Sequence, residues 1–259
     1  MSVLIHQVTP SRCRTMPEKV EDRLIVALDF DSAEKAVELV ERLDGLVSFF
    51  KVGIELQLAE GMKPVNYLIS KGKKVFLDLK YFDVPQTVER AVQHAASLGV
   101  TFLTIHGNGK NIQAAVKGRG SADLKLLAVT VLTSLDGYDI QDLGFNCSVE
   151  ELVIHRAKKA VEAGCDGVIA SGYETKRIRE ALGEKLLIVA PGIRPEGFPK
   201  QDQKRAVTPR DAVQAGADYL VVGRYITTVP DPREAAERVL EEMRQGFKAA
   251  HLPTSVRTE

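Results

Sequence analysis

Short, almost continuously apolar segments recur along the whole chain, each bounded by glycine, aspartate or lysine. They comprise residues 23–30, 48–54, 74–80, 101–107, 125–133, 166–171, 185–193 and 218–224. Segments of this kind are typical of strands that are buried on both faces, as in a parallel sheet. The pattern therefore predicts eight parallel strands.

Amphipathic segments with helical spacing separate these strands. Residues 31–45 begin with an Asp-Ser capping signal and place four apolar residues on one stripe: Ala33, Val37, Val40 and Leu43. Residues 148–164 show the same kind of pattern. Gly99, Gly164 and Gly216 each precede a predicted strand, as glycines that end helices do.

Eight strand-then-helix units without a linker-like segment predict an α/β protein, a single (β/α)₈ TIM barrel. The alternative is a doubly wound open sheet, which would carry a glycine-rich turn after its first strand, whereas residues 29–32 contain no glycine. Segments 163–171 and 215–224 resemble each other, as repeated barrel units would. We expect a flexible extension over residues 1–22, the barrel over 23–248 and a flexible tail over 249–259.

Composition narrows the classes of function. The 259 residues include 35 Lys plus Arg and 35 Asp plus Glu, so the basic excess typical of nucleic-acid and membrane-surface proteins is missing. No apolar run reaches the roughly 18 residues of a membrane span. Three scattered cysteines, Cys13, Cys147 and Cys165, fit a reducing cytoplasm and small apolar side chains, so we expect a cytoplasmic protein without cysteine catalysis.

Polar residues lie where the predicted strands end. Catalytic residues of TIM barrels occupy the carboxyl ends of the strands, and here those positions hold Asp29, Lys51, Asp78 with Lys80, His106, Thr133, Ser171, Arg194 and Arg224. Taken singly, each fits an ordinary strand-end residue that reaches water. Because the ends of all eight strands converge on one mouth, the group favours a shared site.

The densest of these groups is FLDLKYFDVP, residues 76–85, which places Asp78, Lys80 and Asp83 within six positions. Side chains of a strand alternate between its two faces, so Asp78 and Lys80 are predicted to share the face toward the barrel axis. Isolated buried charge is costly. The pattern therefore indicates an ammonium that flanking carboxylates hold in place.

A second group follows the last two predicted strands. Gly192 precedes Arg194 and Gly223 precedes Arg224, at the loops where TIM barrels recurrently bind phosphate. The glycines also fit plain turn residues. The long polar segment 196–209 between the two groups predicts a lid or binding loop.

Several of these segments together resemble the orotidine 5′-phosphate decarboxylase family, in its bacterial form, from about Arg23 to Gly246. The matching motifs are ALDF (27–30), FKVG (50–53), DLKYFDVPQT (78–87), TVLTS (130–134), PGIRP (191–195), DQKR (202–205) and VVGR (221–224). The commonest family version has His-Asp-Ile-Pro-Asn-Thr where residues 82–87 read Phe-Asp-Val-Pro-Gln-Thr. The charged positions are kept.

The resemblance implies an enzyme that decarboxylates orotidine 5′-monophosphate to uridine 5′-monophosphate, the last step of de novo UMP synthesis, without cofactor or metal. It implies an alternating charge network of Lys51, Asp78, Lys80 and Asp83, with Lys80 protonating C6 of the pyrimidine. It also implies a homodimer in which Asp83 reaches the neighbouring active site.

The same resemblance implies the substrate contacts. They are Asp29 and Lys51 at the ribose hydroxyls, Thr87 from the partner subunit, Thr133 near the pyrimidine, Gly223 and Arg224 at the phosphate, and Arg194 and Gln203 in the closing loop. His106 matches a position near the site and is assigned no step.

Two alternatives stay open. The metal-using branch of the same barrel superfamily, such as 3-keto-L-gulonate 6-phosphate decarboxylase or hexulose phosphate synthase, also carries DxKxxD but has a Glu on the second strand to help bind Mg²⁺. This chain has Lys51 there, and an ammonium repels a divalent cation. A catalytically silent nucleotide-binding or interaction module would tolerate loss of a charged network member, yet all four are present.

Overall fold

Eight parallel strands close into a barrel in the order in which they occur along the chain. In the computed structural model, which describes residues 17, 19–107, 109–198 and 206–250, the strands are Leu24–Ala27 (β1), Phe49–Gly53 (β2), Lys74–Tyr81 (β3), Phe102–Ile105 (β4), Lys125–Val129 (β5), Gly167–Ile169 (β6), Leu187–Ala190 (β7) and Tyr219–Val222 (β8). Closure occurs where Leu24 of β1 lies opposite Leu220 of β8. The predicted (β/α)₈ TIM barrel is confirmed.

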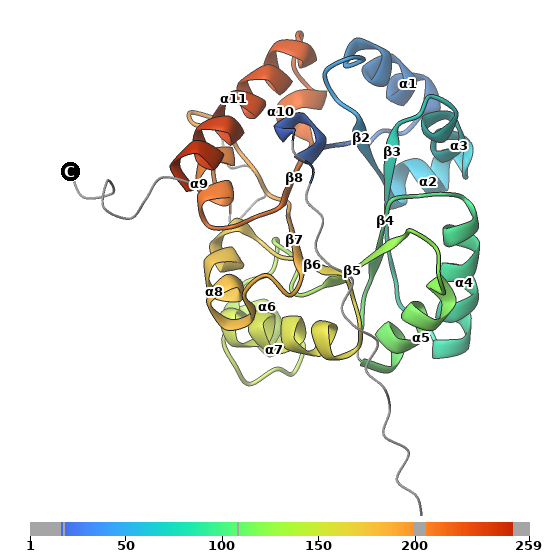
Figure 1. Ribbon diagram of the computed structural model, residues 1–259, viewed down its shortest axis with the longest axis vertical. Coiled ribbons are helices and arrows are strands. Elements are labelled where there is room, and N and C mark those ends of the chain that lie inside the picture. Colours follow the sequence, from blue (N-terminus) through green and yellow to red (C-terminus); the bar gives the residue numbers. More distant parts are fainter. Residues whose placement is uncertain (1–16, 18, 108, 199–205, 251–259) are drawn as a thin grey trace, which may run out of the picture.

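The helices follow the strands and lie outside them, except for the short η1, which precedes β1 (Figure 1). They are η1 (Val20–Arg23), α1 (Ala33–Arg42), α2 (Ile54–Glu60), α3 (Lys63–Ser70), α4 (Pro85–Ser97), α5 (Gly109–Arg119), α6 (Gly137–Asp142), α7 (Val149–Glu162), α8 (Gly172–Leu182), α9 (Pro209–Gln214), α10 (Arg224–Thr227) and α11 (Pro232–Ala250). Gly99, Gly164 and Gly216 have φ of 77°, 83° and 102°, so each ends a helix in the left-handed conformation that glycine favours.

Helix α1 allows the predicted cap and apolar stripe to be compared with the structure. Ser32 caps it as expected, accepting a hydrogen bond from the Lys35 amide at 3.4 Å. Its fully buried residues are Ala36, Leu39, Val40 and Leu43. Val40 and Leu43 of the predicted stripe are therefore fully buried, whereas Ala33 and Val37 are only half-buried. Burial of Leu39 removes more apolar surface from water than burial of Val37 would, which rotates the buried face.

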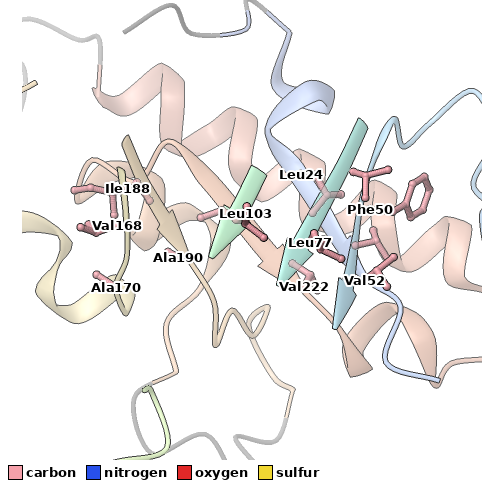
Figure 2. Packing of buried hydrophobic residues seen from close by; sticks show 14 of the residues in the cluster. Leu24, Phe50, Val52, Leu77, Leu103, Val168, Ala170, Ile188, Ala190 and Val222 are labelled. Carbon is pink, nitrogen blue, oxygen red and sulfur yellow. The ribbon is translucent and has the colours of Figure 1, made fainter. Parts of the chain in front are cut away.

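The strands carry two separate apolar layers. Outward-facing side chains pack against the helices, and those labelled in Figure 2 are Leu24, Phe50, Val52, Leu77, Leu103, Val168, Ala170, Ile188, Ala190 and Val222. Inward-facing side chains fill the barrel axis, and four of these are aromatic: Phe49, Phe76, Phe102 and Tyr219. The rings of Phe49 and Phe102 lie edge to face at 4.9 Å, as do those of Phe102 and Tyr219 at 5.0 Å. This packed interior closes the barrel below its mouth.

The two similar segments around Asp166 and Asp218 share one structural role. Asp218, which precedes β8, accepts the Ile188 amide of β7 at 2.7 Å and the Arg179 guanidinium at 2.5 Å. Asp166, which precedes β6, accepts the Leu126 amide of β5 at 2.8 Å and pairs with Arg119. The resemblance between the segments therefore has a physical counterpart, a carboxylate that joins a strand to the helix before it.

The expected chain ends are described only in part. Val20–Arg23 forms a short helix, and the Arg23 guanidinium donates to the Pro17 carbonyl at 2.9 Å. At the other end α11 continues to Ala250, two residues beyond the predicted limit of the barrel. The remainder of the predicted extension and tail, residues 1–16, 18 and 251–259, lies outside the described residues.

Candidate active site

A pocket opens at the carboxyl ends of the strands. It is lined by Lys51, Phe76, Asp78, Lys80, Val129, Val131, Leu132, Thr133, Ile169, Pro191 and Val221. Phe76 also belongs to the aromatic interior, so that layer contributes to the pocket wall. The lining is mostly apolar apart from three charged side chains and one hydroxyl, which is the composition of sites that take a small organic molecule.

The charged side chains form a chain of alternating sign. Lys51 Nζ lies 2.8 Å from Asp29 Oδ1 and 3.7 Å from Asp78 Oδ2. Lys80 Nζ lies 2.9 Å from Asp78 Oδ1. The side chains of Lys51 and Asp78 are only 11% and 14% exposed, so each charge is compensated by an opposite charge instead of by water. Asp29, Lys51, Asp78 and Lys80, four of the strand-end residues, therefore lie next to one another, whereas Asp83 of the expected network is not among them.

Strand β3 departs from regular geometry where it carries Lys80. The pairing of β3 with β4 shifts register between Leu77 and Tyr81, and Lys80 has φ of 51°. Among the described non-glycine residues it alone has positive φ. The simple alternation that predicted a shared face for Asp78 and Lys80 therefore stops at the bulge, although the ammonium still reaches the carboxylate. Residues in this sparsely populated conformation cluster at functional sites.

Gly53 makes room for the Lys51–Asp29 pair. A Cβ at this position would lie 3.0 Å from Lys51 Nζ and 3.2 Å from Asp29 Oδ1. Its backbone, with φ of −98°, is open to any residue, so the requirement is for space and not for conformation. Gly53 is a feature of the site to which sequence reasoning assigned no role.

Two predicted residues lie apart from this network. Asp83 and Thr87 are exposed. The Asp83 carboxylate accepts a hydrogen bond from the Val84 backbone amide at 2.6 Å. The Asp83 backbone carbonyl accepts one from the Asn111 side-chain amide. Thr87 belongs to the first turn of α4, its amide bonded to the Val84 carbonyl at 3.0 Å. Neither side chain lines the pocket of its own chain.

The predicted phosphate residues lie at the ends of β7 and β8. Gly223 directly precedes α10, whose first residue is Arg224. Arg194 is buried, and its amide donates to the Val207 carbonyl at 2.9 Å, next to a β-bridge between Ile193 and Val207. The polar segment 196–209 is therefore closed at its base. Gln203 lies outside the described residues.

Phe198, at the start of that segment, lies edge to face with Tyr225 of α10 at 5.0 Å between ring centroids. This contact joins the segment after β7 to the residue that follows Arg224. The segment after β7 thus contacts helix α10, which begins with Arg224.

The remaining strand-end residues have different surroundings. Thr133 lines the pocket as predicted. Ser171 instead caps α8, accepting the Tyr173 amide at 3.1 Å, so it is an ordinary capping residue. His106 lies edge to face with Phe82 at 5.7 Å. Burial, followed by the charges of Arg156 and Lys80, lowers the pKa of His106 below its usual value.

Three further observations concern metal binding, cysteine reactivity and membrane spans. Across the described ranges, no three His, Cys, Asp or Glu side chains gather in a group able to hold a metal ion. Burial raises the pKa of the Cys165 thiol to about 12, as expected for a small apolar core residue. Of the helices in the described part of the chain, none combines the length and the apolar character needed to cross a membrane.

Comparison with known proteins identifies the family to which the chain belongs. The model of the "Orotidine 5′-phosphate decarboxylase / HUMPS family" matches residues 22–239. A protein named orotidine 5′-phosphate decarboxylase from Nitrobacter winogradskyi is 51% identical over 227 residues, covering 88% of this chain and 95% of that relative. One of the same name from Methylococcus capsulatus is 50% identical over 242 residues, covering 93% and 99%.

A solved structure of similar fold carries the same family name. The crystal structure of orotidine 5′-phosphate decarboxylase from Lactobacillus acidophilus superposes with a TM-score of 0.76 at 37% identity, covering 86% of this chain and 99% of that one. Barrel, pocket and sequence together lead to one conclusion: this chain belongs to the orotidine 5′-phosphate decarboxylase / HUMPS family.

Proposed function

We propose that this chain decarboxylates orotidine 5′-monophosphate to uridine 5′-monophosphate, the last step of de novo UMP synthesis, in the cytoplasm. The names of its relatives support the reaction. The observation that carries the proposal is the Asp29–Lys51–Asp78–Lys80 charge chain, with three of these side chains lining an otherwise mostly apolar pocket.

The chemistry requires a cation at one ring carbon. Loss of CO₂ from C6 leaves an electron pair in the plane of the ring, where the π system does not delocalise it. The Lys80 ammonium stabilises this developing charge electrostatically and then donates a proton to C6, so no cofactor is required. Asp78 orients that ammonium through the 2.9 Å contact, and Lys51 balances the second oxygen of the same carboxylate.

The remaining groups bind the substrate away from C6. Asp29 and Lys51 contact the ribose hydroxyls, and Thr133 contacts the pyrimidine from the pocket wall. Gly223 and Arg224 hold the phosphate, while Arg194 and Gln203 belong to the segment that closes over it. The contact between Phe198 and Tyr225 supports a coupling of phosphate binding to closure.

The site is completed by a second copy of the chain. Asp83 and Thr87 are exposed, and four large apolar side chains are exposed on the same strand-end loops and on α2: Ile54, Leu58, Phe82 and Val84, from 55% to 82%. Exposed apolar side chains on these segments, together with polar residues that do not line the pocket of their own chain, support a homodimer. In that dimer Asp83 extends the charge network of the neighbouring subunit toward its Lys80.

Replacement of Lys80 tests the reaction. Purified wild-type protein should convert orotidine 5′-monophosphate, followed by its absorbance, and Lys80→Ala should lower kcat by at least about 10³-fold while uridine 5′-monophosphate still binds. The control is Lys63→Ala, which removes a 78% exposed ammonium paired only with Glu60 among the described contacts and should leave kcat unchanged. Substantial turnover by Lys80→Ala would refute the assigned role.

Removal of metal ions tests whether the activity requires a divalent cation. Because Lys51 occupies the position where the metal-using branch has a carboxylate, protein dialysed against EDTA should retain its full rate. A rate that falls with EDTA and returns with Mg²⁺ would place the chain in that branch instead.

A further inference from the structure

We propose that Thr104 of β4 is a positioning residue that sets the geometry of Lys80 and Asp78; the inference rests on the function proposed above. Thr104 is fully buried, at 0% exposure, and its neighbours Leu103 and Ile105 are apolar. Phe102, two residues earlier on the same inward face, belongs to the aromatic interior. A buried hydroxyl is destabilising unless it is hydrogen-bonded, so its partners are informative.

The Thr104 hydroxyl makes two hydrogen bonds, both to the charge network. Its oxygen accepts the Lys80 backbone N–H at 2.9 Å, and its O–H donates to Asp78 Oδ1 at 2.9 Å. The Lys80 ammonium donates to that same Oδ1 at 2.9 Å. These bonds form a closed ring that runs from the Lys80 backbone through Thr104 and Asp78 to the Lys80 side chain.

The ring accounts for the unusual backbone at Lys80. Where the β3–β4 register shifts, the hydroxyl takes the place of a ladder carbonyl as acceptor for the Lys80 amide. The left-handed conformation of Lys80, with φ of 51°, is strained for a residue with a Cβ and persists only where its surroundings enforce it. Without the hydroxyl, Lys80 can relax and its ammonium moves relative to Asp78.

Thr104→Val tests this because it keeps the shape and removes the hydroxyl. We expect kcat for orotidine 5′-monophosphate to fall by about 10- to 100-fold, the effect of losing a hydrogen bond to a charged group. The affinity for uridine 5′-monophosphate should change by less than about threefold, since Thr104 does not line the pocket. Thr104→Ser restores the hydroxyl and should keep kcat within about threefold of wild type.

Thr130→Val is the matched control. Thr130 is equally buried, at 0% exposure, but its hydroxyl donates to the Ile169 carbonyl at 2.7 Å and not to the charge network. We expect Thr130→Val to lower the melting temperature while leaving kcat within about threefold of wild type. An equal loss of kcat in both valine variants would show that any buried hydroxyl has this effect, and would overturn the assignment.

Crystal structures of the Thr104 variants decide the question independently of turnover. We expect Lys80 to leave the left-handed region in Thr104→Val and to remain there in Thr104→Ser. If the wild-type chain fails to act on orotidine 5′-monophosphate, the proposed function fails and this readout still tests Thr104. Unchanged Lys80 geometry in Thr104→Val overturns the proposal. If Thr104→Val does not fold, Thr104→Ala replaces it; failure of both to fold, with Thr104→Ser folded, assigns Thr104 to stability alone.

Discussion

At the residue scale, the carboxylate of Asp78 is engaged at both oxygens. Oδ1 accepts from Lys80 and Thr104, and Oδ2 faces Lys51 at 3.7 Å. Removal of one member would leave its partner charged in a mostly apolar pocket, which is far more costly than the net stabilisation that an intact pair provides. The sequence carries this dense cluster of charge because its members compensate one another.

Gly53 offers a test of how closely that network is fitted. In Gly53→Ala the new Cβ would lie 3.0 Å from Lys51 Nζ, so the flexible ammonium has to move away from Asp29. We expect kcat/KM to fall by about tenfold with little change in the free energy of unfolding, measured by kinetics and urea titration. Gly109→Ala, where a Cβ would meet nothing within 4 Å, is the control. Wild-type kinetics in Gly53→Ala would show that Lys51 needs no such space.

His106 predicts how stability depends on pH. Its pKa is lowered by burial and by Arg156 and Lys80, so below about pH 6.5 the unfolded chain binds a proton that the folded chain does not. Stability from this group is therefore present at neutral pH and is lost as pH falls from about 6.5 toward the lowered pKa.

The measurement is urea unfolding at several pH values. Between about pH 7 and 5, His106→Gln should lose less free energy of unfolding than wild type does. His94→Gln, which alters an exposed residue of α4, should follow the wild-type curve. Parallel curves for all three proteins would contradict the role assigned to His106.

At the scale of elements, carboxylates that join a strand to the preceding helix stabilise the barrel. Asp218 is 2% exposed, and it holds both the Ile188 amide and the Arg179 guanidinium. Asp166 does the same for Leu126 and Arg119. A strand placed by such an anchor carries its inward side chains to a fixed height in the barrel, so these pairs also support the mouth.

Loss of one anchor should be severe. Asp218→Ala leaves a guanidinium and a backbone amide without this acceptor, and we expect the free energy of unfolding to fall by about 3–5 kcal/mol. Glu162→Ala, which breaks the exposed pair with Lys159, should lower it by less than about 1 kcal/mol. Chemical denaturation of both variants compares them directly, and similar small losses would mean that the anchor adds little.

At the scale of the whole molecule, the proposed dimer makes a quantitative prediction. Lys80→Ala and Asp83→Ala are each expected to be inactive, but a mixed dimer would contain one site with both groups intact. Equal amounts, unfolded and refolded together, should therefore recover about one quarter of the wild-type activity.

A second mixture provides the control. Lys80→Ala with Asp78→Ala should recover nothing, because both residues belong to the same chain's pocket. If the first mixture stays inactive, Asp83 does not act across subunits.

The sequence by itself determined the barrel and the strand ends at which charged side chains would gather. Eight apolar runs alternating with amphipathic segments leave few ways to bury both faces of each strand, and period-two alternation places Lys51 and Asp78 on the inward face. These are local consequences of residue type and spacing.

Only the tertiary structure decided what depends on several elements at once. The left-handed Lys80, the hydroxyl ring through Thr104 and the space left by Gly53 arise from contacts between strands distant in sequence. The true buried face of α1 follows from packing in the same way. Spacing along one strand carries no information on such contacts, because they are set by the register and the free volume between neighbouring elements.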